Sequence, residues 1–228
     1  MKQISLLFSL LCFAAVVNAQ TKVTIFGDSY STFERYIPET HEPWYAPDGS
    51  KFSKGENNDV KKVEQTWWWQ VIEQMGWQLE VNNSWSGSTV GYFGYQSENY
   101  HERSFNTRVA YLGEPDIIFC FAGTNASWTG ENQGQYKYAN WEENDMWYFR
   151  PALARLCSTM KQNYPKAKIY YILNTELKDW TNESVFTICN HYDISVIVLK
   201  DIDKQWGHPS QKGMQAIAEQ VIDFVKKY

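Results

Sequence analysis

The chain contains little cysteine and few long apolar stretches. Only four of its 228 residues are cysteines, and the three that follow residue 19 are Cys120, Cys157 and Cys189. Because three is an odd number, they cannot all pair in intramolecular disulfides. Cys120 lies inside the apolar run 117–121 and is expected to be a buried thiol. No Cys/His spacing suggests zinc, and we expect neither a metal nor a cofactor.

Blocks of like charge are also lacking. The formal net charge is −5 and is spread along the chain without a long run of one sign. This distribution argues against nucleic acid or an anionic membrane surface as a partner. After residue 19, no segment approaches the roughly 20 apolar residues that span a bilayer. No internal repeat, low-complexity tract or linker divides the chain, and nothing in the sequence indicates an oligomeric state.

The first 19 residues have the pattern of a secretory signal peptide. Lys2 supplies the positive start, residues 4–17 form the apolar run, and residues 17–19 form a small-residue cleavage site before Gln20. Cys12 lies inside the apolar run rather than at its end, which disfavours a lipoprotein anchor. We therefore expect export to the periplasm or the extracellular space, and a single domain over residues 20–228.

Apolar segments of two kinds alternate along the rest of the chain. Short β-branched or aromatic runs predict strands, and runs of helical spacing predict helices. The expected strands are 23–26, 77–81, 116–121, 168–173 and 194–199, and the expected helices are 63–75, 101–112, 147–164, 183–191 and 210–227. This alternation predicts an α/β, three-layer, doubly wound fold around a mainly five-stranded parallel sheet. Two long polar segments, 32–62 and 124–140, are expected to be functional loops.

Polar and glycine-rich blocks follow the carboxyl ends of these strands. They contain Ser29 after the first strand, Gly87 after the second, Asn125 after the third, and His208 before the last helix. Because a doubly wound sheet brings these ends to one edge, the four residues are expected to meet there. Serine is a weak nucleophile that needs an adjacent base, and histidine is the commonest one.

The ordered set Ser, Gly, Asn, His resembles the SGNH (GDSL-type) hydrolases over nearly the whole mature chain, a family with a flavodoxin-like fold. The resemblance implies that Ser29 is the nucleophile and His208 the general base. It also implies an oxyanion hole formed by the backbone N–H groups of Ser29 and Gly87 and by the side chain of Asn125. Such donors suit the negative charge of a tetrahedral intermediate.

One position departs from the family pattern. Members usually carry an aspartate three residues before the histidine, and here that position is Gln205. Asp203 and Asp201 lie on the same loop, and a backbone carbonyl could also orient the imidazole. Of these alternatives we choose Asp203 as the third catalytic residue.

The sequence therefore predicts an exported serine esterase that forms an acyl-enzyme. The expected substrate is an acyl ester, acetyl above all, of a carbohydrate or polysaccharide. Aromatic residues in polar loops are candidate sugar platforms, namely Trp44, Trp85, Trp128 and Trp141. The alternatives are a lipase, lysophospholipase or thioesterase of the same family, and a non-catalytic glycan-binding module on a decayed hydrolase scaffold.

Overall fold

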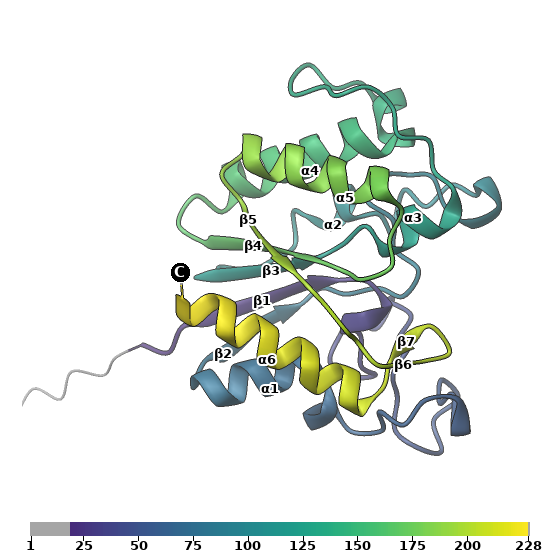
Figure 1. Ribbon diagram of the computed structural model, residues 1–228, viewed down its shortest axis with the longest axis vertical. Coiled ribbons are helices and arrows are strands. Elements are labelled where there is room, and N and C mark those ends of the chain that lie inside the picture. Colours follow the sequence, from purple (N-terminus) through teal and green to yellow (C-terminus); the bar gives the residue numbers. More distant parts are fainter. Residues whose placement is uncertain (1–18, 228) are drawn as a thin grey trace, which may run out of the picture.

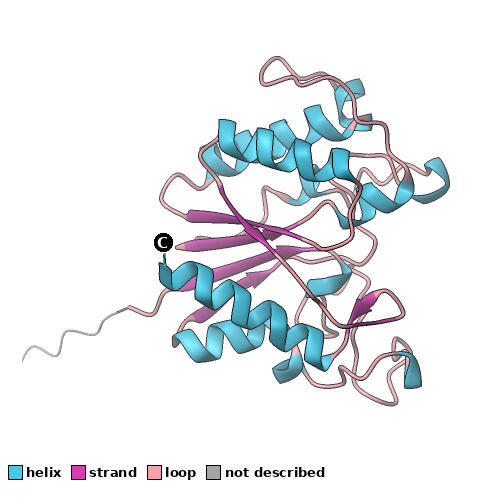
Figure 2. Cartoon of the chain, in the orientation of Figure 1, coloured by secondary structure: helices cyan, strands magenta, loops and turns pink. Residues whose placement is uncertain are grey.

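The centre of the molecule is a five-stranded parallel sheet in the order β2-β1-β3-β4-β5 (Figures 1 and 2). The computed structural model describes residues 19–227, so nearly all of the expected signal peptide, with Cys12, lies outside the described residues. The strands are β1 (Lys22–Gly27), β2 (Gln78–Asn82), β3 (Ile117–Phe121), β4 (Lys168–Leu173) and β5 (Ser195–Val198). The predicted fold class is confirmed.

Helices cover both faces of the sheet (Figure 1). One face carries α1 (Trp67–Met75) and α6 (Gln211–Lys227), and the other carries α2 (Phe105–Arg108), α4 (Phe149–Asn163) and α5 (Asp179–His191). A short helix, α3 (Thr124–Thr129), follows β3 directly. The strand order reverses direction between β1 and β3, the point where doubly wound sheets bind ligands.

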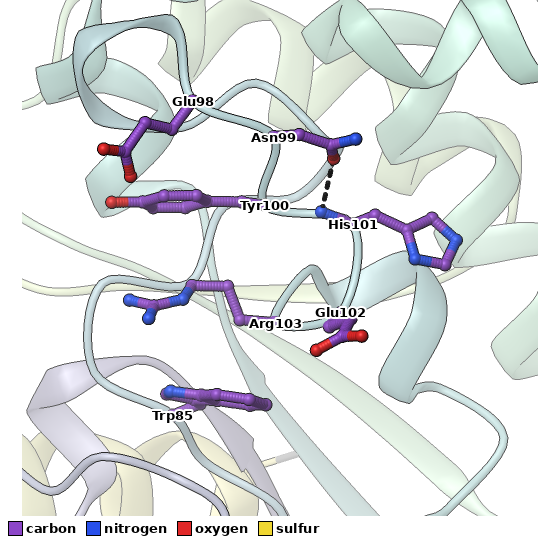
Figure 3. Close-up of a pocket in the computed structure, with 7 residues that line it drawn as sticks. All are labelled: Trp85, Glu98, Asn99, Tyr100, His101, Glu102 and Arg103. Carbon is purple, nitrogen blue, oxygen red and sulfur yellow. Dashed lines mark hydrogen bonds between the residues drawn. The ribbon is translucent and has the colours of Figure 1, made fainter.

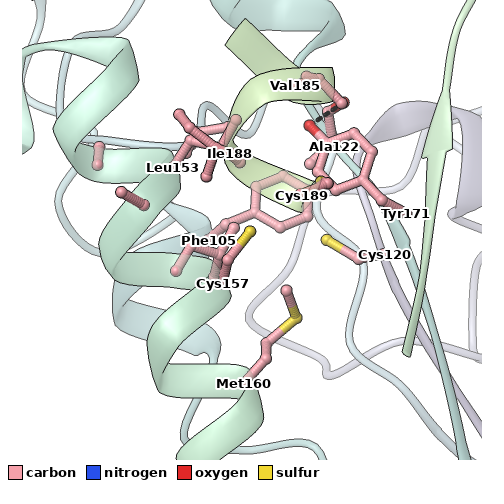
Figure 4. Close-up of a cluster of buried hydrophobic side chains, with 14 of the residues drawn as sticks. Phe105, Cys120, Ala122, Leu153, Cys157, Met160, Tyr171, Val185, Ile188 and Cys189 are labelled. Atoms are coloured by element: carbon pink, nitrogen blue, oxygen red, sulfur yellow. Dashed lines mark hydrogen bonds between the residues drawn. The ribbon is translucent and has the colours of Figure 1, made fainter. Parts of the chain in front are cut away.

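The strand β3 is buried along its whole length, with residues on alternate sides contributing to two hydrophobic clusters. Figure 4 shows part of the cluster under α4 and α5. It contains Cys120, Cys157 and Cys189, all free and buried. The expectation of a buried Cys120 thiol is confirmed.

Short elements complete the carboxyl edge of the sheet. The strands β6 (Lys204–Gln205) and β7 (His208–Pro209) form a small antiparallel hairpin between β5 and α6. The 3₁₀ turns are η1 (Ser29–Ser31), η2 (Gly55–Asn57), η3 (Val63–Gln65), η4 (Tyr95–Ser97) and η5 (Glu143–Trp147). The long polar loop 32–62 covers the hairpin, because Tyr45 and Asn58 both donate side-chain hydrogen bonds to the Pro209 carbonyl.

Two expectations about helices are wrong. The predicted helix 101–112 is reduced to α2, because the backbone N–H groups of Phe105 and Asn106 donate to Thr89 and Val90 instead of to an earlier helical turn. Segment 124–140 begins with α3 rather than a loop. This helix is bounded by Gly123 and Gly130, both left-handed, and is too short to show periodicity. The other expected elements lie within four residues of the observed bounds.

No helix in the described part of the chain is long and apolar enough to cross a membrane.

Candidate active site

The turn after β1 presents Ser29 at the sheet edge. Asp28 caps this turn, its Oδ1 accepting the Tyr30 N–H at 3.0 Å. Gly27 is required before it, because a Cβ there would lie 2.5 Å from the Ser31 Cβ and 2.8 Å from the Ser84 Oγ. Burial raises the pKa of Asp28 to about 7, although the hydrogen bond from Tyr30 opposes the shift. Asp28 thus belongs to the turn, while the Ser29 hydroxyl faces outward from it.

The β6–β7 hairpin presents His208 to the same edge. Its two turn residues, Trp206 and Gly207, have φ values of 52° and 72°. Two successive positive φ values correspond to a type I′ turn, whose twist matches that of a tight hairpin. Tyr30 donates from its hydroxyl to the Gly207 carbonyl at 2.5 Å, which joins the hairpin to the Ser29 turn.

Ser29 and His208 are in direct contact. The distance from Ser29 Oγ to His208 Nε2 is 2.9 Å, and His208 Nδ1 lies 3.1 Å from the Trp206 carbonyl oxygen. Because a carbonyl can only accept, Nδ1 carries the proton and Nε2 is free to accept the serine proton. This is the geometry that a general base needs in order to activate a hydroxyl.

The sequence-based choice of Asp203 as the orienting residue is wrong. The Asp203 carboxylate instead accepts the hydroxyl proton of Ser210, the residue that precedes α6. The Gln205 side chain is also engaged elsewhere, accepting the Asp59 N–H at 2.8 Å. The tight turn brings the Trp206 carbonyl to the imidazole, so the backbone takes the position that a carboxylate usually occupies.

The electrostatics keep His208 neutral. Burial above all, with the charges of Lys54 and Lys204, lowers its pKa to about 4, against the opposing effect of the hydrogen bond to Trp206. The residue as a whole is 7% exposed. At neutral pH it is therefore unprotonated and able to accept a proton.

Three possible oxyanion donors lie at the ends of three strands. Within residues 19–227, the backbone N–H groups of Ser29 and Gly87 donate to no acceptor. Asn125 uses one Nδ2 hydrogen for the Ser88 carbonyl at 3.0 Å, which leaves the second hydrogen free. Gly87 has a φ of 80°, a conformation that favours glycine. The three groups predicted from the sequence are thus available as donors.

Sequence reasoning missed two residues that hold these groups in place. The Tyr95 hydroxyl donates to Asn125 Oδ1 at 2.9 Å and so fixes the amide orientation. Arg108 is buried, and its guanidinium donates to the carbonyls of Asn83 and Gly27 at 2.5 and 3.4 Å. It thereby joins the carboxyl ends of β1 and β2. Position in the sequence gives no signal for either contact.

Most of the predicted sugar platforms have another role. Trp44 is stacked on His208 and has Lys54 above its opposite face. Trp85 lies between His41 and Arg103.

Trp141 packs against the hydrophobic cluster and donates its indole N–H to the Lys137 carbonyl. The prediction for Trp44 is corrected, because both faces of its ring are covered. Trp85 also has both faces covered but lines the hollow described next, and the role of Trp141 stays a prediction. Trp128 differs, since it is 42% exposed and its ring centroid is 6.4 Å from that of His208.

A hollow of about 490 Å³ adjoins the loop that contains Gly87. Figure 3 shows its lining, in which the Arg103 guanidinium lies between the rings of Tyr100 and Trp85. Arg103 also donates to the Ser86 carbonyl at 3.3 Å, which anchors the lining to the oxyanion loop. The other lining residues are mostly polar or charged, namely Glu98, Asn99, His101 and Glu102.

No group of three or more His, Cys, Asp or Glu side chains in residues 19–227 is arranged to hold a metal ion.

The parallel sheet, with a serine and a histidine in contact at its carboxyl edge, defines an α/β serine hydrolase that acts on ester bonds. Comparison with known families agrees with this class. The chain belongs to the GDSL-like lipase/acylhydrolase family, whose sequence profile matches residues 21–225.

Solved structures show the same relationship. The chain is similar to a protein designated a GDSL-like lipase from Bacteroides ovatus, with 47% identity, a TM-score of 0.89, and coverage of 92% of this chain and 100% of the other. A second such protein, from Bacteroides uniformis, has 50% identity, a TM-score of 0.88, and coverage of 92% and 97%.

A family two carbohydrate esterase from Cellvibrio japonicus has 15% identity, a TM-score of 0.62, and coverage of 91% and 61%, and shares the fold. A comparison with curated proteins gave no match.

Proposed function

We propose that this protein is an exported serine esterase that removes short acyl groups, acetyl above all, from carbohydrates. The observation that carries the proposal is the 2.9 Å contact between Ser29 Oγ and His208 Nε2, beside N–H donors without acceptors. In this reaction Ser29 attacks the ester carbonyl, and His208 takes its proton and passes it to the leaving alcohol. Ser29 N–H, Gly87 N–H and the free Asn125 hydrogen stabilise the oxyanion. Water then releases the acyl group by the same route.

The chemistry of the hollow beside Gly87 supports a carbohydrate as the alcohol part. Its carboxylates, amide and guanidinium offer acceptors and donors that suit hydroxyl groups, and they provide no continuous apolar wall for a long acyl chain. The carbohydrate esterases that share the fold are consistent with such a substrate. Export rests on the pattern of residues 1–19, and amino-terminal sequencing of the secreted protein is expected to begin at Gln20.

A lipid acyl hydrolase is the second candidate, favoured by the designation of the two Bacteroides proteins. A panel of 4-nitrophenyl esters from acetate to palmitate, together with acetylated xylan, separates the two. We expect acetate release from xylan and a fall in kcat/KM with acyl length. A maximum at long chains would favour the lipase.

The catalytic assignment is tested by Ser29→Ala. This change removes the nucleophile, and we expect turnover to fall by roughly 10³-fold or more and labelling by a fluorophosphonate to disappear. Ser31→Ala is the matched control, because Ser31 belongs to the same turn but its hydroxyl accepts the Trp67 indole N–H at 3.2 Å. Labelling that persists in Ser29→Ala would contradict the assignment. Absence of both labelling and ester hydrolysis from the native protein would favour the glycan-binding alternative.

A further inference from the structure

Trp206 occupies a backbone conformation that its side chain does not favour. It is the first turn residue of the β6–β7 hairpin, with a φ of 52°. This position of a type I′ turn is usually asparagine, aspartate or glycine, since a bulky side chain is strained at positive φ. The hairpin itself therefore gives no reason for a tryptophan here.

The role of Trp206 in holding the base does not require an indole either. The contact to His208 Nδ1 is made by the backbone carbonyl, which every residue has. The side chain is 72% exposed, the highest value among the exposed large hydrophobic residues of the described chain. A strained backbone conformation that brings no evident gain in stability is characteristic of functional positions.

A second exposed indole lies at the same turn. Trp128, at the end of α3, has its ring edge 4.0 Å from the point where a Cβ of Gly207 would be. Its ring also contacts those of His208 and Tyr30 edge-on, with centroids 6.4 and 6.5 Å away. Two elements from distant parts of the sequence thus place exposed indoles beside the His208 turn.

We propose that Trp206, together with Trp128, forms a platform for a pyranose ring in the alcohol part of the substrate ester. The inference rests on the proposed function and names two residues that would recognise the carbohydrate. The C–H face of a sugar packs on an indole, while its hydroxyls stay in water or meet polar groups. An alkyl chain fits the site less well, because rings this exposed leave much of its surface in water.

The platform can be tested without breaking the hairpin. Trp206→Asn creates Asn-Gly, the favoured type I′ pair, and keeps the carbonyl that holds His208. We expect the melting temperature to stay equal or rise. We expect KM for an acetylated xylo-oligosaccharide to rise about tenfold, as a loss of roughly 1.4 kcal/mol of binding implies. The ratio of kcat/KM for this substrate to kcat/KM for 4-nitrophenyl acetate should fall accordingly, and Trp206→Phe should be intermediate.

Tyr111→Ser is the control, because the Tyr111 side chain is 69% exposed. The hydrogen bond that it receives from Asn83, at 2.9 Å, is accepted by its backbone carbonyl, which the substitution keeps. Its selectivity ratio should equal that of the native protein. An unchanged ratio in Trp206→Asn would overturn the proposal, as would a loss that is equal for both substrates.

Binding to the inactive Ser29→Ala protein, measured by calorimetry with the deacetylated oligosaccharide, separates this inference from the proposed function. Weaker binding when Trp206→Asn is added would support the platform even if the preferred acyl group were not acetyl. Equal binding, or none in either protein, would overturn the platform, although hydrolysis of simple esters would still support the esterase.

Discussion

The Trp44 indole lies flat on the imidazole of His208, with ring centroids 3.4 Å apart and planes 8° from parallel. The backbone N–H of Trp44 donates to Thr32 Oγ1 at 2.8 Å, and that hydroxyl donates to the Ser29 carbonyl at 3.0 Å. The base is therefore aligned by a residue that is itself fixed to the serine turn. In the absence of a carboxylate on Nδ1, this stack and the Trp206 carbonyl share the task of orienting the ring.

Replacement of Trp44 should affect turnover more than substrate binding. In Trp44→Leu the imidazole loses its flat neighbour, and we expect kcat to fall by about 10- to 100-fold, or roughly 1.4–2.7 kcal/mol in the barrier. Trp44→Phe keeps an aromatic face and should recover most of the loss. Initial rates with 4-nitrophenyl acetate give kcat and KM separately. A normal kcat with a raised KM would mean that Trp44 contacts the substrate instead.

The acid limb of the pH profile should respond to Lys54. The ammonium lies 4.6 Å above the far face of Trp44, and its charge contributes to lowering the pKa of His208 to about 4. In the native protein, kcat/KM should therefore fall only as the pH drops towards about 4, where His208 becomes protonated. Removing the charge in Lys54→Met raises the pKa of His208, so the limb should move to higher pH.

High salt should reduce the difference between the native and Lys54→Met profiles, because salt screens partly exposed charges. Lys51→Met serves as the control, since Lys51 lies over Phe52 rather than Trp44. If both lysine variants keep the native pH profile at low salt, the charge of Lys54 does not affect the pKa of His208.

Tyr95 should support the oxyanion hole without contacting the substrate. Tyr95→Phe removes the hydrogen bond to Asn125 Oδ1 and frees the amide to turn. We expect kcat to fall about tenfold with little change in KM, less than the 10²–10³-fold cost of losing a donor outright. With 4-nitrophenyl acetate, which has no sugar to enter the hollow that Tyr100 lines, Tyr100→Phe is the control. The Tyr100 ring packs on Arg103, and its hydroxyl has no hydrogen-bond partner among the described residues. If the two variants had the same kcat and KM, Tyr95 would not support the oxyanion hole.

Asp203 should matter for stability rather than catalysis. Its carboxylate accepts the Ser210 hydroxyl, whose oxygen in turn accepts the Gly213 N–H in the first turn of α6 at 3.1 Å. Asp203→Asn weakens this cap, and we expect the unfolding free energy to fall by about 1–2 kcal/mol while turnover changes less than threefold. Urea unfolding and steady-state rates measure the two effects. A hundredfold fall in the turnover of Asp203→Asn would show instead that Asp203 takes part in catalysis.

Much of the fold, and the residues proposed to carry out catalysis, could be predicted from the sequence. The buried strand before Ser29 and the run 117–121 have strong local patterns, and the sheet edge they share follows from the handedness of their connections. Ser29, Gly87, Asn125 and His208 are recognisable because their chemical types follow the strand ends in a fixed order.

The contacts that orient those residues could not be read in this way. The partner of His208 Nδ1 is a carbonyl, which every position offers, and only the left-handed conformation of Trp206 brings the right one to the imidazole. Trp44 lies in the middle of a long loop without periodicity. Its stacking on His208 depends on tertiary contacts, so the local sequence wrongly indicates a role in substrate binding.

The serine and the imidazole that it touches are 179 positions apart in the chain. Neither half of the chain contains both groups, because Ser29 follows β1 whereas the hairpin with His208 lies between β5 and α6. During refolding, turnover should therefore recover only once this long-range contact has formed. A chain cut short before residue 208 would carry the nucleophile with no partner.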